Sequence, residues 1–313
     1  MPTVVYCWEM GTGYGHVGPF SPVAKRFVAE GWRVVLIVKE LFRVEPFFEA
    51  SQVEIVQAPA KLSTPVPFVS NPPTYGHILL NLGYEDVTAL TQHVAAWRDI
   101  LTSLNPDLIV FDHSPTAILA SRGLSARQAS IGTGFCCPRA EHPMPLMATW
   151  QSLPADQCLQ DEQRLVGHIN VALSQLQAPV IGELAGMFHD LDANLLTTWP
   201  ELDHYGQRED CEYFGTWSVN AATTNEELVQ QWTQKDGPKL FAYLKPMPTL
   251  PDLVRVIGSL PVEALLVIDN AAAVELQASA PANVVITSQP LPMEPVLDHC
   301  DLAVLNGNHG TVC

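Results

Sequence analysis

Short strand-like apolar runs alternate with longer amphipathic stretches along most of the chain, and this alternation limits the possible folds more than any other feature. In the first half the runs cover residues 4–8, 34–38, 53–57, 108–111 and 128–131. Strands that alternate with helices build a parallel sheet covered by helices on both faces. A first helix is expected to begin near Gly18 and Pro19 and to end at Glu30 and Gly31. The pattern predicts an α/β fold.

A second alternating series follows a polar segment at residues 218–236, where we expect a linker and a short helix. Its strands are predicted at 239–244, 264–269, 284–288 and 302–305, and its helices at 250–260, 271–280 and 293–300. A chain of 313 residues is also too long for one ordinary core. We therefore expect two Rossmann-like, doubly wound parallel-sheet domains, at residues 1–217 and 237–313. A doubly wound domain needs about 100 to 150 residues, so the second domain is expected to be incomplete.

Charge and cysteine spacing narrow the class of protein. A formal net charge of −17, with 16 lysines and arginines, argues against a nucleic-acid partner, since such binding depends on cationic contacts to phosphate. No apolar run reaches the roughly 18 residues that a membrane crossing needs. The N-terminus lacks the pattern of a cleavable signal, so a cytosolic (cytoplasmic) protein is expected. Seven cysteines without C-x-x-C spacing predict reduced thiols and no zinc motif.

Two proline-rich segments are predicted to be loops that build a binding pocket. Residues 61–84 lack a steady period, and residues 137–145 follow the strand at 128–131. Loops at such places commonly carry binding residues. The Pro, Phe, Leu and Met residues at 61–84 and 137–149 favour an apolar acceptor, aromatic or lipid-like.

The glycine-rich loop after the first strand allows two interpretations. Gly13, Gly15 and Gly18 have the spacing G-x-G-x-x-G and, with Glu40 after the second strand, match a dinucleotide fingerprint. That interpretation, a nicotinamide-dependent oxidoreductase, rests on spacing alone. His16 lies inside the loop, where a pyrophosphate-binding turn has no use for an imidazole.

His16 is the first candidate for proton chemistry. A histidine at the carboxyl end of a strand in an α/β sheet points into the ligand crevice, and imidazole titrates near neutral pH. Asp112 ends another strand of the same predicted sheet and is a candidate to hold the imidazole in one tautomer. The alternatives are that His16 only caps a helix, that Asp112 caps the helix near Pro115, and that His113 is the partner instead.

The run from Asn306 to Thr311 directly follows the last predicted strand. Its backbone N–H groups are suited to hold phosphate, with the Thr311 hydroxyl as a further donor. An ordinary Gly/Asn turn is the alternative.

With these loops placed, the chain resembles the GT-B glycosyltransferases that use nucleotide-diphosphate sugars, a group that contains UDP-glucuronosyl, flavonoid and macrolide glycosyltransferases. The likeness spans essentially the whole chain. It is most specific at residues 13–19, which look like the family's GHxxP-type loop, and at 107–112 and 284–311. Residues 198–202 and 213–215 look like the segments that end the N-terminal, acceptor-binding domain.

The resemblance implies an inverting glycosyltransferase with His16 as the general base and Asp112 as its orienting carboxylate. His16 takes the proton of an acceptor hydroxyl as the oxygen attacks the anomeric carbon. The co-substrate is a UDP- or dTDP-sugar, and neither a metal nor another cofactor is expected. The residues expected to bind the donor are Gly15, Leu291, Asn306, Gly307, Asn308, His309, Gly310 and Thr311.

The donor side departs from the family pattern. Where relatives carry a histidine in an H-G-G run, this chain has Asn306, Gly307 and Asn308, with His309 as the candidate replacement. Pro290 and Met293 stand where many relatives carry Trp and Gln. Relatives also continue beyond the phosphate loop into a helix, so weak donor binding and self-association through the second domain are expected here. A catalytically silent GT-B-like binding or accessory protein is therefore the second hypothesis.

Overall fold

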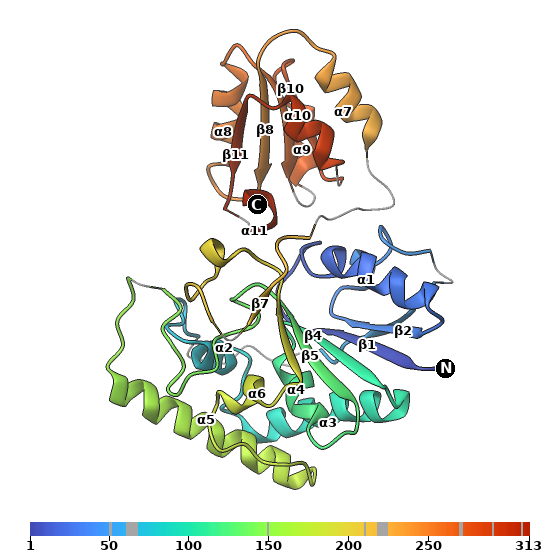
Figure 1. Cartoon of the computed structure of the whole chain (residues 1–313). Coiled ribbons are helices and arrows are strands. Elements are labelled where there is room, and N and C mark those ends of the chain that lie inside the picture. Colours follow the sequence, from blue (N-terminus) through green and yellow to red (C-terminus); the bar gives the residue numbers. More distant parts are fainter. Residues whose placement is uncertain are drawn as a thin grey trace. The chain divides into compact units, whose positions relative to one another are not determined.

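The computed structural model of the chain describes residues 1–49, 52–60, 68–148, 150–209, 211–217, 225–268, 272–289, 291–307 and 309–313. The chain divides into two compact units, unit 1 at Met1–Trp217 and unit 2 at Ser218–Cys313 (Figure 1). Each unit has its own parallel sheet. Among the described residues, no helix combines the length and the apolar character that crossing a membrane requires.

Unit 1 contains a seven-stranded parallel sheet in the order β3-β2-β1-β4-β5-β6-β7. The strands are β1 (Thr3–Trp8), β2 (Arg33–Val38), β3 (Glu54–Gln57), β4 (Leu108–Asp112), β5 (Arg127–Gly132), β6 (Ala193–Leu196) and β7 (Glu212–Tyr213). The five predicted strands are all present, with ends shifted by at most one residue. The chain adds strands on one side of β1 and then crosses to the other side at β4, so the strand order reverses between β1 and β4.

Helices cover both faces of this sheet (Figure 1). They are α1 (Val17–Ala29), α2 (Tyr75–Asn81), α3 (Val87–Leu104), α4 (Pro115–Ser121), α5 (Ala155–Gln175) and α6 (Gly186–His189), with short 3-10 turns η1 (Leu41–Arg43) and η2 (Pro200–Leu202). The predicted first helix is α1, and Gly31 after it has φ +82°. One continuous core joins the sheet to α3, α4 and α5.

Alternation along β1 assigns its side chains to two faces. Val5 and Cys7 lie in the core shared with α3, α4 and α5. Tyr6 faces α1 instead, since its ring stacks on Phe20 of that helix with centroids 4.3 Å apart. Successive strand residues point to opposite faces, so Trp8 shares the α1 face with Tyr6.

Unit 2 contains a four-stranded parallel sheet in the order β10-β9-β8-β11. Its strands are β8 (Lys239–Leu244), β9 (Glu263–Ile268), β10 (Val284–Thr287) and β11 (Leu302–Leu305), and its helices are α7 (Glu226–Thr233), α8 (Leu250–Gly258), α9 (Ala272–Ala278), α10 (Met293–His299) and α11 (His309–Val312). One core lies between the sheet and helices α8 and α9, and a second core lies between the sheet and helices α7 and α10. The predicted second series is confirmed, strand for strand.

One local prediction and one alternative need correction. Residues 61–84 are not one long loop, because α2 occupies Tyr75–Asn81, where Ile78 and Leu79 are buried in the main core; residues 61–67 lie outside the described part. The run after β11 is not only a turn, because α11 begins at His309. The second proline-rich segment, 137–145, is irregular as predicted.

Candidate active site

The site in unit 1 lies where the strand order of its sheet reverses. β1 and β4 pair in parallel, with Trp8 opposite Asp112, so both strands end at the same edge. Ligands of open α/β sheets bind at the carboxyl ends of the strands, at such a reversal. The loop after β1 carries His16 to the start of α1, directly beside the end of β4.

The structure brings His16 and Asp112 together. The Nδ1 atom of His16 lies 2.8 Å from Oδ1 of Asp112, and the two side chains are 14% and 8% exposed. An ionised carboxylate can only accept a hydrogen bond, so the Nδ1 atom of His16 carries a proton and is the donor in this contact. In this tautomer the lone pair of the neutral imidazole is on Nε2, where a general base needs it.

The helix-cap alternatives are wrong for both residues. His16 holds the N-cap position of α1, yet its side chain makes no capping hydrogen bond. Ser114, and not Asp112, precedes α4. A free N–H at the start of α4 is bound by Glu9 instead, whose Oε2 accepts from the Thr116 amide at 2.9 Å.

Opposing effects act on the pKa of His16. Burial lowers it, whereas the charge of Asp112 and the hydrogen bond to Asp112 raise it; Lys39 lowers it slightly and Glu40 raises it. The net result is a pKa above the ordinary 6.5. The carboxylate thus stabilises the protonated imidazole that forms when His16 accepts a proton.

His113 is not the partner of His16. Its ring centroid lies 6.3 Å from that of His16. Burial, with the nearby charge of His16, lowers the pKa of His113 to about 3. An imidazole with so low a pKa is a weak base at neutral pH, so of the two histidines His16 is the better candidate for proton transfer.

Aromatic side chains surround the pair. Trp8 stacks on His16 with centroids 5.1 Å apart, and Phe135 and Tyr75 pack against the ring of His113. The Tyr75 hydroxyl and Nε2 of His113 are buried without a hydrogen-bond partner among the described residues. The surroundings of the pair are therefore apolar and aromatic.

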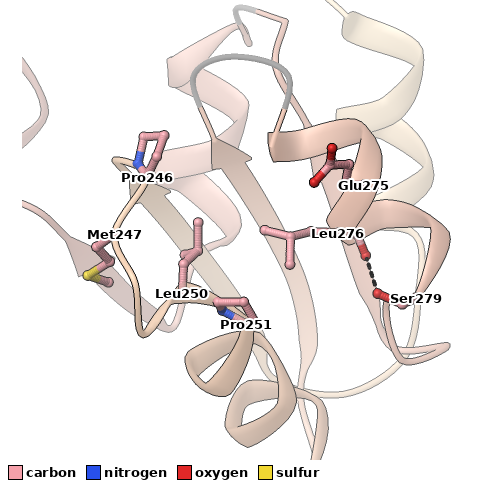
Figure 2. Close-up of a pocket in the computed structure, with 7 residues that line it drawn as sticks. All are labelled: Pro246, Met247, Leu250, Pro251, Glu275, Leu276 and Ser279. Carbon is pink, nitrogen blue, oxygen red and sulfur yellow. Dashed lines mark hydrogen bonds between the residues drawn. The ribbon is translucent and has the colours of Figure 1, made fainter.

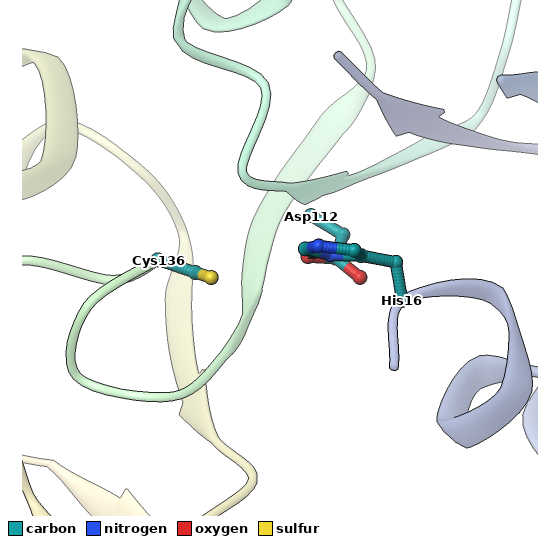
Figure 3. A group of neighbouring side chains, drawn as sticks. All are labelled: His16, Asp112 and Cys136. Carbon is teal, nitrogen blue, oxygen red and sulfur yellow. Dashed lines mark hydrogen bonds and ion pairs between the residues drawn. The ribbon is translucent and has the colours of Figure 1, made fainter. Parts of the chain in front are cut away.

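The thiol of Cys136 lies near the His16–Asp112 pair. Its sulfur is directed toward His16 and Asp112 (Figure 3), and ligand atoms of the three residues lie within 4.8 Å of one another. This is the set of described side chains able to offer three ligands to a metal. A thiol must lose its proton to bind a metal, and burial together with the charge of Asp112 raises the pKa of Cys136 well above its usual value. The arrangement favours proton chemistry.

Besides Cys136 and the aromatic side chains, sequence reasoning missed two residues that contact the pair directly. The Tyr6 hydroxyl donates to Oδ2 of Asp112 at 2.7 Å. Gly11 lies against His16: a Cβ atom at Gly11 would be 2.3 Å from the His16 Nε2 atom. The available signal for Tyr6 was its place in β1, two residues before Trp8 and so on the same face.

The predicted donor residues lie mostly at the carboxyl end of β11 in unit 2. Asn306 and Gly307 follow the strand and are exposed, and the Asn306 amide donates to the Tyr243 carbonyl of β8 at 3.2 Å. Gly307 has φ +76°, which favours glycine. Gly310 and Thr311 lie in α11, with Gly310 exposed. Asn308 lies outside the described residues.

The three remaining residues predicted to bind the donor, His309, Leu291 and Gly15, differ in charge and in exposure. Burial lowers the pKa of His309, so its imidazole is neutral and does not replace a cation. Leu291 is buried in the core with α7 and α10 and is not open to a donor. Gly15 lies in the loop of unit 1, with open space around its Cα.

A pocket of about 350 Å³ opens between α8 and α9 of unit 2 (Figure 2). It is lined by Pro246, Met247, Leu250, Pro251, Glu275, Leu276 and Ser279. These described side chains are mainly apolar and the one charged group is a carboxylate, which repels phosphate. The pocket is unsuited to a diphosphate.

The acidic residue that the oxidoreductase interpretation requires, Glu40, already has a partner. A dinucleotide fingerprint needs a carboxylate free to bind ribose hydroxyls. The Glu40 carboxylate instead pairs with Arg43 at 3.2 Å.

Comparison with solved structures identifies the fold. Similar structures include CalG4, the calicheamicin glycosyltransferase (16% identity, TM-score 0.64, 99% of this chain and 75% of that chain). The glycosyltransferase VinC in complex with dTDP has 13% identity and a TM-score of 0.61 over 100% of this chain and 77% of that chain. A UDP-glucosyltransferase from Polygonum tinctorium has 13% identity and a TM-score of 0.60, over 99% and 76%. No family model and no curated protein matches the sequence.

Proposed function

We propose that this chain, which has the GT-B fold, is an inverting glycosyltransferase that moves a sugar from a nucleotide diphosphate to a hydroxyl of a small, largely apolar acceptor. The observation that carries the proposal is the hydrogen bond between His16 and Asp112. It lies at the reversal point of the first sheet, where this class of sheet binds ligands.

In this mechanism His16 is the general base. Asp112 holds Nδ1–H, which leaves the Nε2 lone pair to take the proton of the acceptor hydroxyl. As the proton leaves, the hydroxyl oxygen forms a bond to the anomeric carbon from the face opposite the diphosphate. The imidazolium that results is stabilised by the charge of Asp112.

The bond from the anomeric carbon to the diphosphate oxygen breaks in the same step, and its electron pair leaves with the nucleotide. The exposed residues Gly307 and Gly310 supply the proposed backbone site for this anion. Asn306 adds only its side chain, because its backbone N–H already bonds to the Tyr243 carbonyl. Backbone N–H groups hold phosphate without cationic side chains, which suits a chain of net charge −17. His16 then releases the acceptor proton to solvent, so the balanced reaction gives a glycoside, a nucleoside diphosphate and a proton.

The surroundings of His16 support an aromatic acceptor. Phe135, which is partly exposed, packs edge-on against the His113 ring. Trp8 stacks on His16 from inside the protein and is fully buried. Flat apolar rings prefer stacked or edge-on contacts with such side chains.

Donor binding tests the proposal against the alternative of a silent GT-B-like binding protein, which Asn306 favours. We expect isothermal titration with UDP- and dTDP-sugars to give a dissociation constant of about 0.1 to 1 mM with at least one donor. Asn306→His places an imidazole where relatives carry one and should tighten this binding about 3- to 10-fold. NADH serves as the control ligand and should give no heat.

The two hypotheses differ in this experiment. Heat from a sugar nucleotide that increases in Asn306→His supports a donor site after β11. If neither protein gives heat with any donor, the transferase proposal fails and the binding-protein alternative takes its place. Heat with NADH alone would restore the oxidoreductase interpretation.

A further inference from the structure

The carboxylate of Asp112 has two partners, and the second one is Tyr6. Oδ1 of Asp112 bonds to His16 at 2.8 Å, and Oδ2 accepts from the Tyr6 hydroxyl at 2.7 Å. Tyr6 is fully buried and Asp112 is 6% exposed. The three side chains form a continuous chain of hydrogen bonds that runs from the interior of unit 1 to the ligand edge of its sheet.

The register of β1 and β4 explains this contact. Tyr6 pairs with Val110 and Trp8 pairs with Asp112. Residues two apart share a face of a strand, so Tyr6 and Asp112 point the same way, toward α1. The Tyr6 ring stacks on Phe20 at an interplanar angle of 17°. This stacking fixes the ring, and the hydroxyl at its end reaches Asp112, two residues beyond Val110 on the neighbouring strand.

Tyr6 is a donor in this contact at any working pH. Burial, then the charge of Asp112 and the hydrogen bond to it, raise the pKa of Tyr6 well above 10. The phenol therefore keeps its proton and directs it at the carboxylate. A hydrogen bond to a charged group is about twice as strong as one between neutral groups.

We propose that Tyr6 is a positioning residue that acts on His16 through Asp112: its hydroxyl takes up part of the carboxylate charge and so sets the basicity of His16. The inference rests on the proposed role of His16 as the base. Neighbouring hydrogen bonds to one anion share its charge. When the Tyr6 hydroxyl is removed, the carboxylate interacts more strongly with its remaining partner, and the protonated form of His16 is stabilised.

Other groups also act on His16. Lys39, Glu40 and His113 influence its charge, and Cys136 lies beside Asp112. Tyr6→Phe leaves these four groups in place and keeps the ring that stacks on Phe20. A change in His16 titration in this variant is therefore due to the lost hydroxyl.

The test is the titration of His16 in the full chain, followed by NMR on ¹⁵N-histidine protein. The chain has 10 histidines, and the His16 signal is the one that disappears in His16→Gln. We expect Tyr6→Phe to raise the His16 pKa by about 0.5 to 1 pH unit. Tyr84→Phe is the matched control, because Tyr84 is another buried phenol whose hydroxyl bonds to Thr116 at 2.9 Å. It should leave the His16 titration unchanged.

A second variant covers the case in which Tyr6→Phe does not fold. Difluorotyrosine at position 6 keeps the ring and makes the phenol a stronger donor, so the His16 pKa should fall. No shift in either Tyr6 variant, or an equal shift in Tyr84→Phe, overturns the inference. Since the titration needs no substrate, a shift in a protein that transfers no sugar supports the role of Tyr6 and refutes the proposed function separately. In an active protein the acidic limb of kcat/KM should move with the pKa.

Discussion

His16→Ala is expected to reduce the rate of sugar transfer by about 10²- to 10⁴-fold, the usual contribution of a general base. Acceptor affinity should change little, because the imidazole acts on the hydroxyl proton and the aromatic side chains around it remain. Because the missing group is an imidazole, added imidazole should restore part of the rate. Initial rates of glycoside formation, with and without imidazole, measure both effects.

His93→Ala is the matched control for this variant. His93 pairs with Glu9 at 3.1 Å, and its side chain is 18% exposed, so it is also a partly buried histidine held by a carboxylate. It lies on α3, on the other face of the sheet from α1. Transfer should persist in His93→Ala. Full activity in His16→Ala, or an equal loss in both variants, would show that His16 is not the base.

Gly11→Ala is expected to lower transfer by about 10²-fold. A Cβ atom at Gly11 would lie 2.3 Å from Nε2 and 3.0 Å from Cε1 of His16. The imidazole must then move, or the backbone must, and the methyl group occupies the space in front of the lone pair. A displacement of about 1 Å in a reacting group costs about this factor. Single-turnover rates at saturating acceptor measure it.

Gly13→Ala separates this contact from backbone strain. Both glycines have left-handed φ angles, +82° at Gly11 and +86° at Gly13, so alanine costs about 1 to 2 kcal/mol of stability at either position. A Cβ atom at Gly13 has nothing within 4 Å. Gly13→Ala should unfold more readily yet transfer sugar at about the wild-type rate. If both variants lose activity equally, the loop conformation matters and the contact with Nε2 does not.

Much of the fold could be predicted because strand and helix periods are strong in this sequence. The strands β8 and β11 have the predicted bounds. Strands β6 and β7, of four and two residues, were too short to show a period. Helix α2 was hidden by the prolines and glycines around it, and only its contacts with the core show why it forms.

The pair at the site was predictable for a topological reason. Strands of a parallel sheet end at one edge, so a histidine after β1 and an aspartate at the end of β4 meet there if β1 and β4 are neighbours. The contact of Tyr6 required the register, in which Trp8 pairs with Asp112. The closeness of Gly11 to His16 depends on the loop conformation, which residue types alone do not specify. Leu291 was chosen by resemblance, and its burial depends on how α7 and α10 pack.

The pH dependence of kcat/KM in the wild-type chain tests the central claim most directly, because its acidic limb reports the pKa of the base in the free enzyme. His16 must be unprotonated to act, and Asp112 raises its pKa. Activity should therefore rise with pH through an inflection above 6.5, and Asp112→Asn should move that inflection to lower pH. An inflection below 6.5, or a rate that does not change through this range, would contradict the assignment of His16 as a base held by Asp112.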